Sequence, residues 1–176
     1  MSEKNAGRET LGFVLFGVGL FLLLSLVSYD IADVSPSPIR PGTHHNLGGP
    51  AGAWVAHQIL STIGIVSALW AGALMLWGLL LAFGFVLWPM PRRLVACVLL
   101  SLILAAGAHL ELPESLPLHV PAGYGGSIGG GIGLALLHTV GQVGAVLVLA
   151  LAALISLVLT RNFTVSESTD KLVRSR

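Results

Sequence analysis

The sequence predicts an all-α integral membrane protein with four transmembrane helices. Three observations carry this prediction: 55% of the 176 residues are hydrophobic, only 10% are charged, and no charged residue lies between Arg40 and Arg92 or between Glu114 and Arg161. A soluble domain carries about 25% charged residues. Long uncharged stretches rich in Leu, Val, Ala and Gly instead suit the hydrocarbon core of a bilayer.

The lengths of the apolar stretches set the predicted spans. Residues 11–28 and 94–110 are each close to the ~20 residues that cross about 30 Å of hydrocarbon. The stretches at 51–87 and 128–160 exceed one crossing, because a helix rises about 1.5 Å per residue. We therefore predict that each begins as a Gly-rich interfacial segment and continues as one span. The predicted interfacial segments are 48–59 and 125–133, and the spans that follow them are about 60–87 and 134–160.

The basic residues predict how the chain is oriented in the membrane. Only Arg40 lies in a loop on one side of the predicted spans, and eight basic residues lie on the other: Lys4, Arg8, Arg92, Arg93, Arg161, Lys171, Arg174 and Arg176. The positive-inside rule then places both termini in the cytoplasm. Residues 1–10 form a cytoplasmic N-terminus, residues 11–160 the membrane domain, and residues 161–176 a cytoplasmic tail or the start of a linker.

An internal repeat relates the second and fourth spans. The segment that starts at Gly48 aligns without a gap on the one that starts at Gly125, and it keeps glycine, threonine and alanine at several equivalent positions. This offset of 77 predicts two helical hairpins, arranged as a parallel repeat about an axis along the membrane normal. We expect Gly48-Gly49 and Gly125-Gly126 to turn the chain into helix at the outer interface, with Ser127 able to cap the fourth helix.

Small residues at intervals of four predict close helix contacts in the second and fourth spans. Two polar stripes near these residues, around His57 and His138, favour the same interpretation. Two alternatives are open, because such a face can join helices within one chain or between copies of it. The candidate packing or oligomer residues are Gly64, Ala68, Gly72, Gly141 and Ala145.

The sequence predicts no catalytic, cofactor or metal site. A phosphate-binding P-loop is excluded because lysine occurs only at positions 4 and 171. The G-x-S-x-G around Ser127 lacks the strand before it and the acid after it that a hydrolase needs. Adjacent His44 and His45 do not have a recognisable zinc-ligand spacing. The single cysteine, Cys97, is expected to be a small buried residue.

Three segments, taken in order, resemble a known family. SYDIADVSPSP follows the first span, NLGGPAGAWVA precedes the second, and GGSIGGGIGLALLHTVGQVGAVLVLALAALISLVL covers the fourth. Together they resemble the N-terminal four-helix membrane domain of the FtsK/SpoIIIE DNA translocases, over roughly residues 11–160. The resemblance implies a multi-pass anchor and septum-targeting domain in the bacterial inner membrane. It also implies a role in cell division and chromosome segregation, coupled to a hexameric cytoplasmic ATPase that moves double-stranded DNA.

The resemblance also sets the expected partners. These are the lipid bilayer, further copies of the chain (a hexamer by resemblance) and other membrane proteins of the division site. No ATP site or DNA-binding domain follows Thr160 within these 176 residues. We therefore expect either part of a longer motor protein, which would contact DNA only through a motor domain not present here, or a stand-alone adaptor of the division machinery. A small transporter or channel is a third alternative, but the predicted spans lack the midplane charge expected of one.

Overall fold

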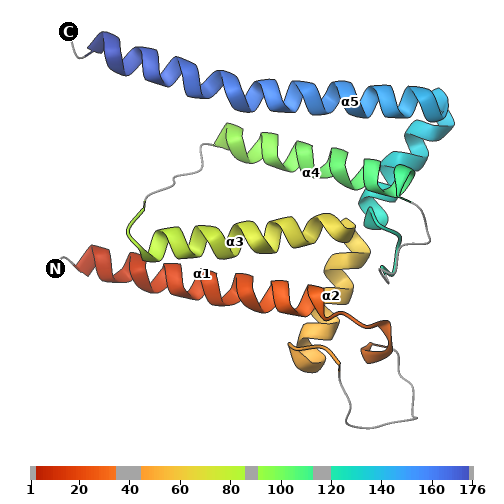
Figure 1. Cartoon of the computed structure of the whole chain (residues 1–176), viewed down its shortest axis with the longest axis horizontal. Helices are drawn as coiled ribbons and strands as arrows, with labels where there is room; N and C mark the ends of the chain where they lie inside the picture. The colour runs from red at the N-terminus through yellow and green to blue at the C-terminus, as the bar shows by residue number, and fades with distance from the viewer. Residues whose placement is uncertain (1–2, 35–44, 86–90, 113–119, 175–176) are drawn as a thin grey trace.

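The computed structural model describes residues 3–34, 45–85, 91–112 and 120–174, and the side chains of residues 6–34, 45–85, 94–112 and 120–158. Every regular element in these ranges is helical, which confirms the predicted fold class (Figure 1). The elements are α1 (Glu3–Val27), the short 3-10 helix η1 (Ile31–Asp33), α2 (Gly49–Ile63), the 3-10 turn η2 (Gly64–Val66), α3 (Ser67–Ala82), α4 (Pro91–Glu111) and α5 (Gly126–Arg174).

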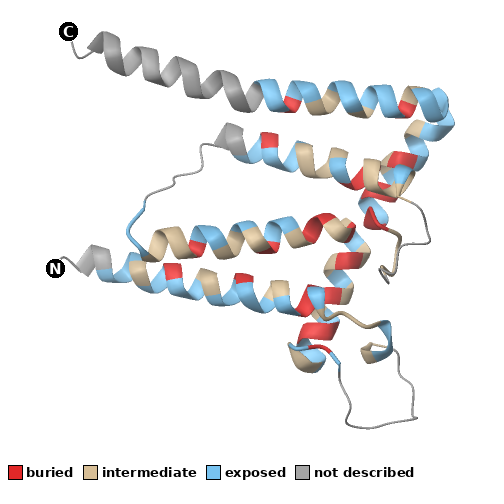
Figure 2. Cartoon of the chain, in the orientation of Figure 1, coloured by how far each residue is buried: buried red, intermediate tan, exposed pale blue. Residues whose placement is uncertain are grey.

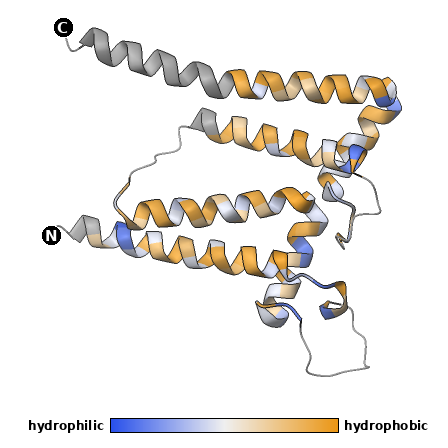
Figure 3. Cartoon of the chain, in the orientation of Figure 1, coloured by the Kyte–Doolittle hydropathy of each residue, from blue (hydrophilic) through white to orange (hydrophobic). Residues whose placement is uncertain are grey.

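Four helical stretches are long and apolar enough to cross a membrane, in agreement with the four predicted spans (Figure 3). They are Ala6–Val27, Gly49–Ala82, Leu94–Glu111 and Gly126–Val158. The start of α1, the end of α3, the start of α4 and the end of α5 all lie at one end of the bundle (Figure 1). We call the opposite end, which holds η1, α2, η2 and the start of α5, the distal end. That the distal end faces outward stays a prediction from the basic residues.

Two glycines bend the second and fourth stretches. Gly64 has φ 70° and ψ −152°, and Gly141 has φ 70° and ψ 177°. This region of backbone space is essentially restricted to glycine, because a Cβ would collide with the chain. We call α2 the first arm and residues 126–140 of α5 the second arm. Each arm is a helix that leads into a break, and the longer spanning helix follows the break.

The spans were predicted to start at about residues 60 and 134. The breaks, at Gly64 and Gly141, lie a few residues beyond these starts. The predicted interfacial segments are themselves helical from Gly49 and Gly126, and they continue as helix until the break. Hydropathy placed these boundaries, whereas the backbone torsions of two glycines determine where the helices bend. The predicted capping role of Ser127 is wrong, since α5 begins at Gly126 and Ser127 therefore lies inside its first turn.

The first hairpin is formed by α1 packed along α3, and glycines allow their backbones to approach closely. A Cβ added at Gly19 would lie 2.5 Å from the backbone nitrogen of Met75. A Cβ added at Gly12 would overlap the backbone of Ala82, and one added at Gly78 would overlap that of Phe16. Small residues are used in this way wherever membrane helices come into backbone contact.

The second hairpin is formed by α4 packed along α5. Ala105 and Ala106 on α4 and Ala145 on α5 are fully buried. Farther along, the buried hydroxyl of Ser156 donates a hydrogen bond of 3.0 Å to the carbonyl oxygen of Ala96. Dispersion contacts between small residues and occasional hydrogen bonds of this kind hold membrane helices together, because lipid is as apolar as the helix surface.

Buried residues are scattered along the contacts between paired helices and are most continuous around α2, η2 and the start of α5 (Figure 2). Much of the remaining described surface is exposed and apolar (Figure 3). In a membrane protein such a surface contacts lipid chains. Cys97 belongs to this surface, so the expectation that it is buried is wrong. It follows buried Ala96 directly, and adjacent residues on a helix point in directions about 100° apart.

Gly19→Ala tests the close approach of α1 to α3. The added methyl group would press on the Met75 backbone, and overpacking of this kind typically costs about 1–3 kcal/mol. We expect that loss in the free energy of unfolding, measured by titration with a denaturing detergent. Gly17→Ala is the control on the same helix, since nothing lies within 4 Å of its added Cβ. Equal effects of the two substitutions would contradict the proposed contact.

Candidate functional site: the junction at the distal end

The two hairpins meet at the first helix break. The backbone N–H of Ile65, directly after the break, donates a hydrogen bond of 2.9 Å to the carbonyl oxygen of Tyr124. A Cβ added at Gly64 would overlap that oxygen, and a Cβ added at Gly126 would lie 2.6 Å from the nitrogen of Gly64. The break in the first hairpin is therefore closed by the turn that begins the second arm. We call this contact the junction.

The junction is buried on both sides. Gly64, Gly125 and Gly126 are buried, Val66 is 5% exposed and Tyr124 is 8% exposed. A peptide N–H that loses its helical partner at a break needs another acceptor, because an unpaired buried N–H costs free energy. The carbonyl of Tyr124 is that acceptor for Ile65. The junction thus provides a hydrogen-bond partner for the backbone at the residue where the helix is interrupted.

The second arm packs directly against α4. A Cβ added at Gly125 would overlap the carbonyl oxygen of Ala105, and one added at Gly129 would lie 2.6 Å from it. One turn after Ala105 on α4, the ring of His109 also lies against the arm, 3.1 Å from a Cβ added at Gly130. These glycines let the arm lie directly on the α4 backbone, which fixes the turn at Tyr124 in front of the first break.

Asn46 connects α1 to the first arm in a comparable way. Its side-chain amide donates a hydrogen bond of 2.8 Å to the carbonyl oxygen of Ser25 near the end of α1. Its side-chain oxygen accepts one of 2.9 Å from the N–H of Gly48, just before α2. Helix ends leave such carbonyls and N–H groups without intrahelical partners. One buried side chain therefore satisfies groups at the ends of two helices.

The carboxylate of Asp33 fixes the segment that contains Asn46. It accepts hydrogen bonds from the backbone N–H of His45, at 3.1 Å, and of Asn46, at 2.7 Å. The Asp33 side chain is only 2% exposed, whereas that of His45 is 70% exposed. His45 Nδ1 lies 3.8 Å from the carboxylate, so its ring adds at most a weak surface ion pair.

Tyr29 and His57 form a second link between α1 and the first arm. The phenol oxygen lies 2.8 Å from His57 Nδ1. Partial burial, and then the nearby charge of Asp30, raise the pKa of the Tyr29 phenol above its usual value of 10. The phenol therefore keeps its proton at neutral pH and can donate a hydrogen bond to the imidazole nitrogen.

The predicted packing residues occupy different environments. Gly64 lies at the centre of the junction, and Ala145 is fully buried in the second hairpin. Gly141 forms the second break with nothing within 4 Å of an added Cβ. Ala68 and Gly72 are half-buried, and a Cβ at Gly72 would also meet open space. The structure thus brings Gly64 together with the predicted turn Gly125-Gly126, and it leaves Gly72 and Gly141 without such contacts.

The other predicted turn, Gly48-Gly49, lies against α1. A Cβ added at Gly48 would overlap the hydroxyl oxygen of Ser25, which is itself fully buried. Gly49 has φ +64°, the same value as Gly126. The threonines of the two polar stripes bond to their own helices: Thr62 donates to Gln58 O at 2.6 Å and Thr139 to Ala135 O at 2.9 Å.

Sequence analysis missed Asn46, Tyr124 and the glycines between α1 and α3. Gly12 and Gly19 are spaced by seven, an interval that returns to the same helix face, so this face was visible in the sequence. Asn46 precedes Gly48-Gly49 by two residues, which is a usual position for an Asn that bonds the backbone ahead of it. Tyr124 contributes its main-chain oxygen, and its residue type gave no signal for that role.

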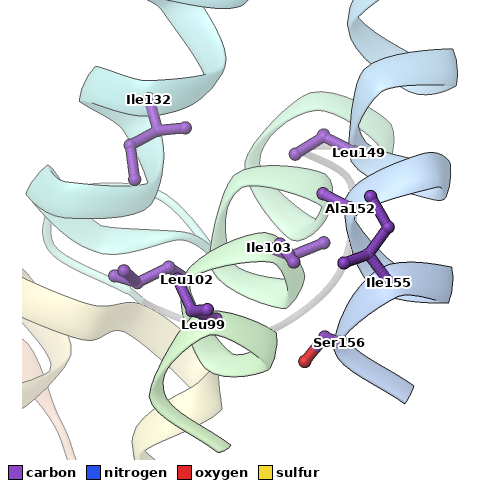
Figure 4. Close-up of a pocket in the computed structure, with 8 residues that line it drawn as sticks. All are labelled: Leu99, Leu102, Ile103, Ile132, Leu149, Ala152, Ile155 and Ser156. Atoms are coloured by element: carbon purple, nitrogen blue, oxygen red, sulfur yellow. The ribbon is translucent and has the colours of Figure 1, made fainter. Parts of the chain in front are cut away.

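A groove of about 250 Å³ lies between α4 and both parts of α5 (Figure 4). Aliphatic side chains line it, together with Ser156, whose hydroxyl donates to Ala96. The lining residues provide no acid, base or metal ligand. Across the part of the chain that the structure describes, no three His, Cys, Asp or Glu residues are grouped as a metal site would require. His44 and His119 lie outside the described residues.

The fold and the junction define a class of protein: a multi-pass helical membrane domain built from two hairpins, each with an arm that bends at a glycine. Residues 4–173 match the family described as the 4TM region of DNA translocase FtsK/SpoIIIE. The chain belongs to this family.

A curated relative supports the same assignment. The chain is 33% identical over 175 residues to DNA translocase FtsK 2 of Ralstonia nicotianae (strain ATCC BAA-1114 / GMI1000). The alignment covers 89% of this chain and 21% of the relative, so the chain spans about a fifth of that protein's length. No solved structure matches the chain.

Comparing Gly64→Ala with Gly141→Ala distinguishes the stability provided by the junction from the backbone strain that any side chain causes at a break. Both replacements force a side chain into a glycine-only backbone region, which costs about 1–3 kcal/mol. Only Gly64→Ala also drives a methyl group into the carbonyl of Tyr124. We expect Gly64→Ala to destabilise monomeric protein in detergent clearly more than Gly141→Ala, as measured by thermal unfolding. The reverse order would show that the junction does not hold the hairpins together.

Asn46→Ala should loosen the distal end by removing the hydrogen bonds to Ser25 and Gly48. A buried polar group left without its partner costs about 1–3 kcal/mol. We expect a loss of that size in the free energy of unfolding. The matched control is His45→Ala, which keeps the backbone bond to Asp33 and removes an exposed ring. A stability of Asn46→Ala equal to that of the control would refute the linking role.

Proposed function

We propose that this chain is the membrane-anchoring and septum-targeting domain of a DNA translocase that acts in cell division and chromosome segregation at the bacterial inner membrane. The observation that carries the proposal is the family match, which includes all four spanning helices. The relative named above is itself called a DNA translocase, and the aligned part is a fifth of its length. Translocation would belong to a motor domain, and this part would hold such a motor at the membrane.

The arrangement of the helices suits an anchor. α5 continues as helix to Arg174, and its end lies at the same end of the bundle as the start of α1 (Figure 1). A motor attached there would pull on α5, and α5 is held by α4 along one side and by the junction at its start. Force on one helix would in this way be shared by both hairpins.

The distal end suits recognition of division-site partners. It presents the two arms and η1, and the hydrogen bonds of Asp33 and Asn46 fix their connections to the membrane helices. A rigid surface loses little conformational entropy when a partner binds. We infer that the arms are the part of the domain that other division proteins contact.

A fluorescent protein fused after Arg176 tests targeting in dividing cells. We expect membrane fluorescence concentrated in a band at the division site. The control carries the same reporter on an unrelated four-span protein of that membrane, which should be distributed evenly. An even distribution of this chain would overturn septum targeting, and soluble fluorescence would overturn anchoring.

The coding sequence of the gene distinguishes a motor anchor from a stand-alone adaptor. A P-loop motif encoded in the same reading frame would support the motor anchor, because ATP-driven translocation requires a nucleotide site. A stop codon directly after residue 176 would leave the adaptor as the function of this chain.

A further inference from the structure

The internal repeat leaves two surfaces without the partner that their equivalents have. The first break, at Gly64, is covered by the turn Tyr124-Gly125-Gly126 of the second arm. The second break, at Gly141, has nothing within 4 Å of an added Cβ. In the first hairpin, Leu47-Gly48-Gly49 is the turn that begins the first arm. It is the equivalent of the covering turn, 77 residues earlier.

Residues at the first break and its covering turn are buried, whereas their equivalents in the other half of the repeat are exposed. Val66, beside the covered break, is 5% exposed, and its equivalent Val143 is 76% exposed. Tyr124, in the covering turn, is 8% exposed, and its equivalent Leu47 is 71% exposed. One chain therefore presents both halves of a second junction, an uncovered break and an unused turn.

The backbone shapes of the two halves match those in the existing junction. Gly64 and Gly141 share φ 70°, and Gly49 and Gly126 share φ 64°. Gly141 therefore breaks its helix in the same backbone region as Gly64, although a 3-10 turn follows Gly64 and α-helix follows Gly141. The glycine that begins each arm has the same positive φ. A turn that fits the first break has the backbone form that the second break needs.

We propose that copies of this chain assemble head to tail through a repeat of the junction. The turn Leu47-Gly48-Gly49 of one copy covers the Gly141 break of the next. The carbonyl of Leu47 takes the role of the Tyr124 carbonyl and accepts the N–H of Gln142, the equivalent of Ile65. Leu47 and Val143 become buried in this contact.

The occupant is a second copy because the chain itself carries the matching turn. In Figure 1 the second arm reaches from its own hairpin to the break of the first, and the first arm extends from the first hairpin away from the second. A neighbouring copy placed beyond the first arm would offer its Gly141 break to that arm. Such an interface uses different surfaces on the two copies, and it builds a closed ring if the rotation per copy closes.

This inference rests on the proposed function only for the expectation that an anchor of this kind assembles. Its contacts come from the repeat alone. Cysteine crosslinking in membranes tests it separately from septum localisation. A localised fusion without the predicted crosslink would overturn the interface alone.

The central experiment pairs Leu47→Cys with Gln142→Cys in a Cys97→Ser background, using a short thiol-specific crosslinker on the 176-residue chain in lipid nanodiscs or native membranes. We expect the double variant to give a ladder of crosslinked multimers. Each single variant should give no crosslinked multimers on a denaturing gel, because neither surface meets its own equivalent. Ile65→Cys with Tyr124→Cys is the matched control, and it should link within one chain.

Two results would overturn the proposal. One is the absence of multimers from the Leu47/Gln142 pair while the Ile65/Tyr124 control links. The other is efficient dimer formation by either single variant, which would indicate a symmetric contact of one surface with itself.

Leu47→Asp provides a second test that does not rely on crosslinking. Leu47 is exposed in the single chain, so the substitution should leave the fold intact and place a charge in the proposed contact. We expect native mass spectrometry to shift from multimers to monomer. The control is Ile31→Asp, at another exposed apolar position of the distal end, which should keep the multimers. Multimers that survive Leu47→Asp unchanged would contradict the interface.

Discussion

The close approach of two glycine backbones, at Gly64 and Gly126, is the constraint on which the rest of the structure depends. A membrane helix that bends sharply exposes peptide groups that its own turns no longer satisfy, and hydrocarbon offers them no partner. Here the N–H of Ile65 finds the carbonyl of Tyr124, which is possible only because neither glycine carries a Cβ. At Gly64 the bend and the docking of the second hairpin therefore stabilise each other. Without the docked turn the bend would leave a buried donor unpaired, and without the bend the turn would have nowhere to fit.

The consequences extend from backbone geometry to proposed function. Because each arm leaves its spanning helix at a break, it lies across the distal end and reaches beyond its own hairpin (Figure 1). The second arm uses this reach to join the two hairpins of one chain. The first arm has the same form, and Leu47, in the turn that precedes it, is exposed. An anchor for a translocating motor needs to resist force and to assemble with other copies of itself. A junction that repeats from one hairpin to the next would serve both needs with one kind of contact.

Hydropathy predicted the four spans, and the glycine pattern drew attention to Gly64 and Gly141 as packing residues. They did not show that Gly64 and Gly141 are breaks, because a glycine in a small-residue row looks the same whether it allows packing or bends the helix. The α1–α3 contact at Gly12 and Gly19 was not predicted, because these glycines are spaced by seven and do not form a row at intervals of four. Cys97 was misplaced because hydropathy does not say which apolar face meets protein and which meets lipid. Asn46 and Tyr124 act through contacts that exist only once distant segments have come together.

Amide hydrogen exchange at Ile65 tests the central claim most directly. The junction predicts slow exchange of this N–H in the native chain, although it lies at a helix break where the helical bond is missing. It also predicts fast exchange in Gly126→Ala, whose added methyl group would lie 2.6 Å from the Gly64 nitrogen and would push the covering turn away. Slow exchange that is lost in the variant is the result the account predicts. Fast exchange in the native chain, or slow exchange that persists in Gly126→Ala, would contradict it.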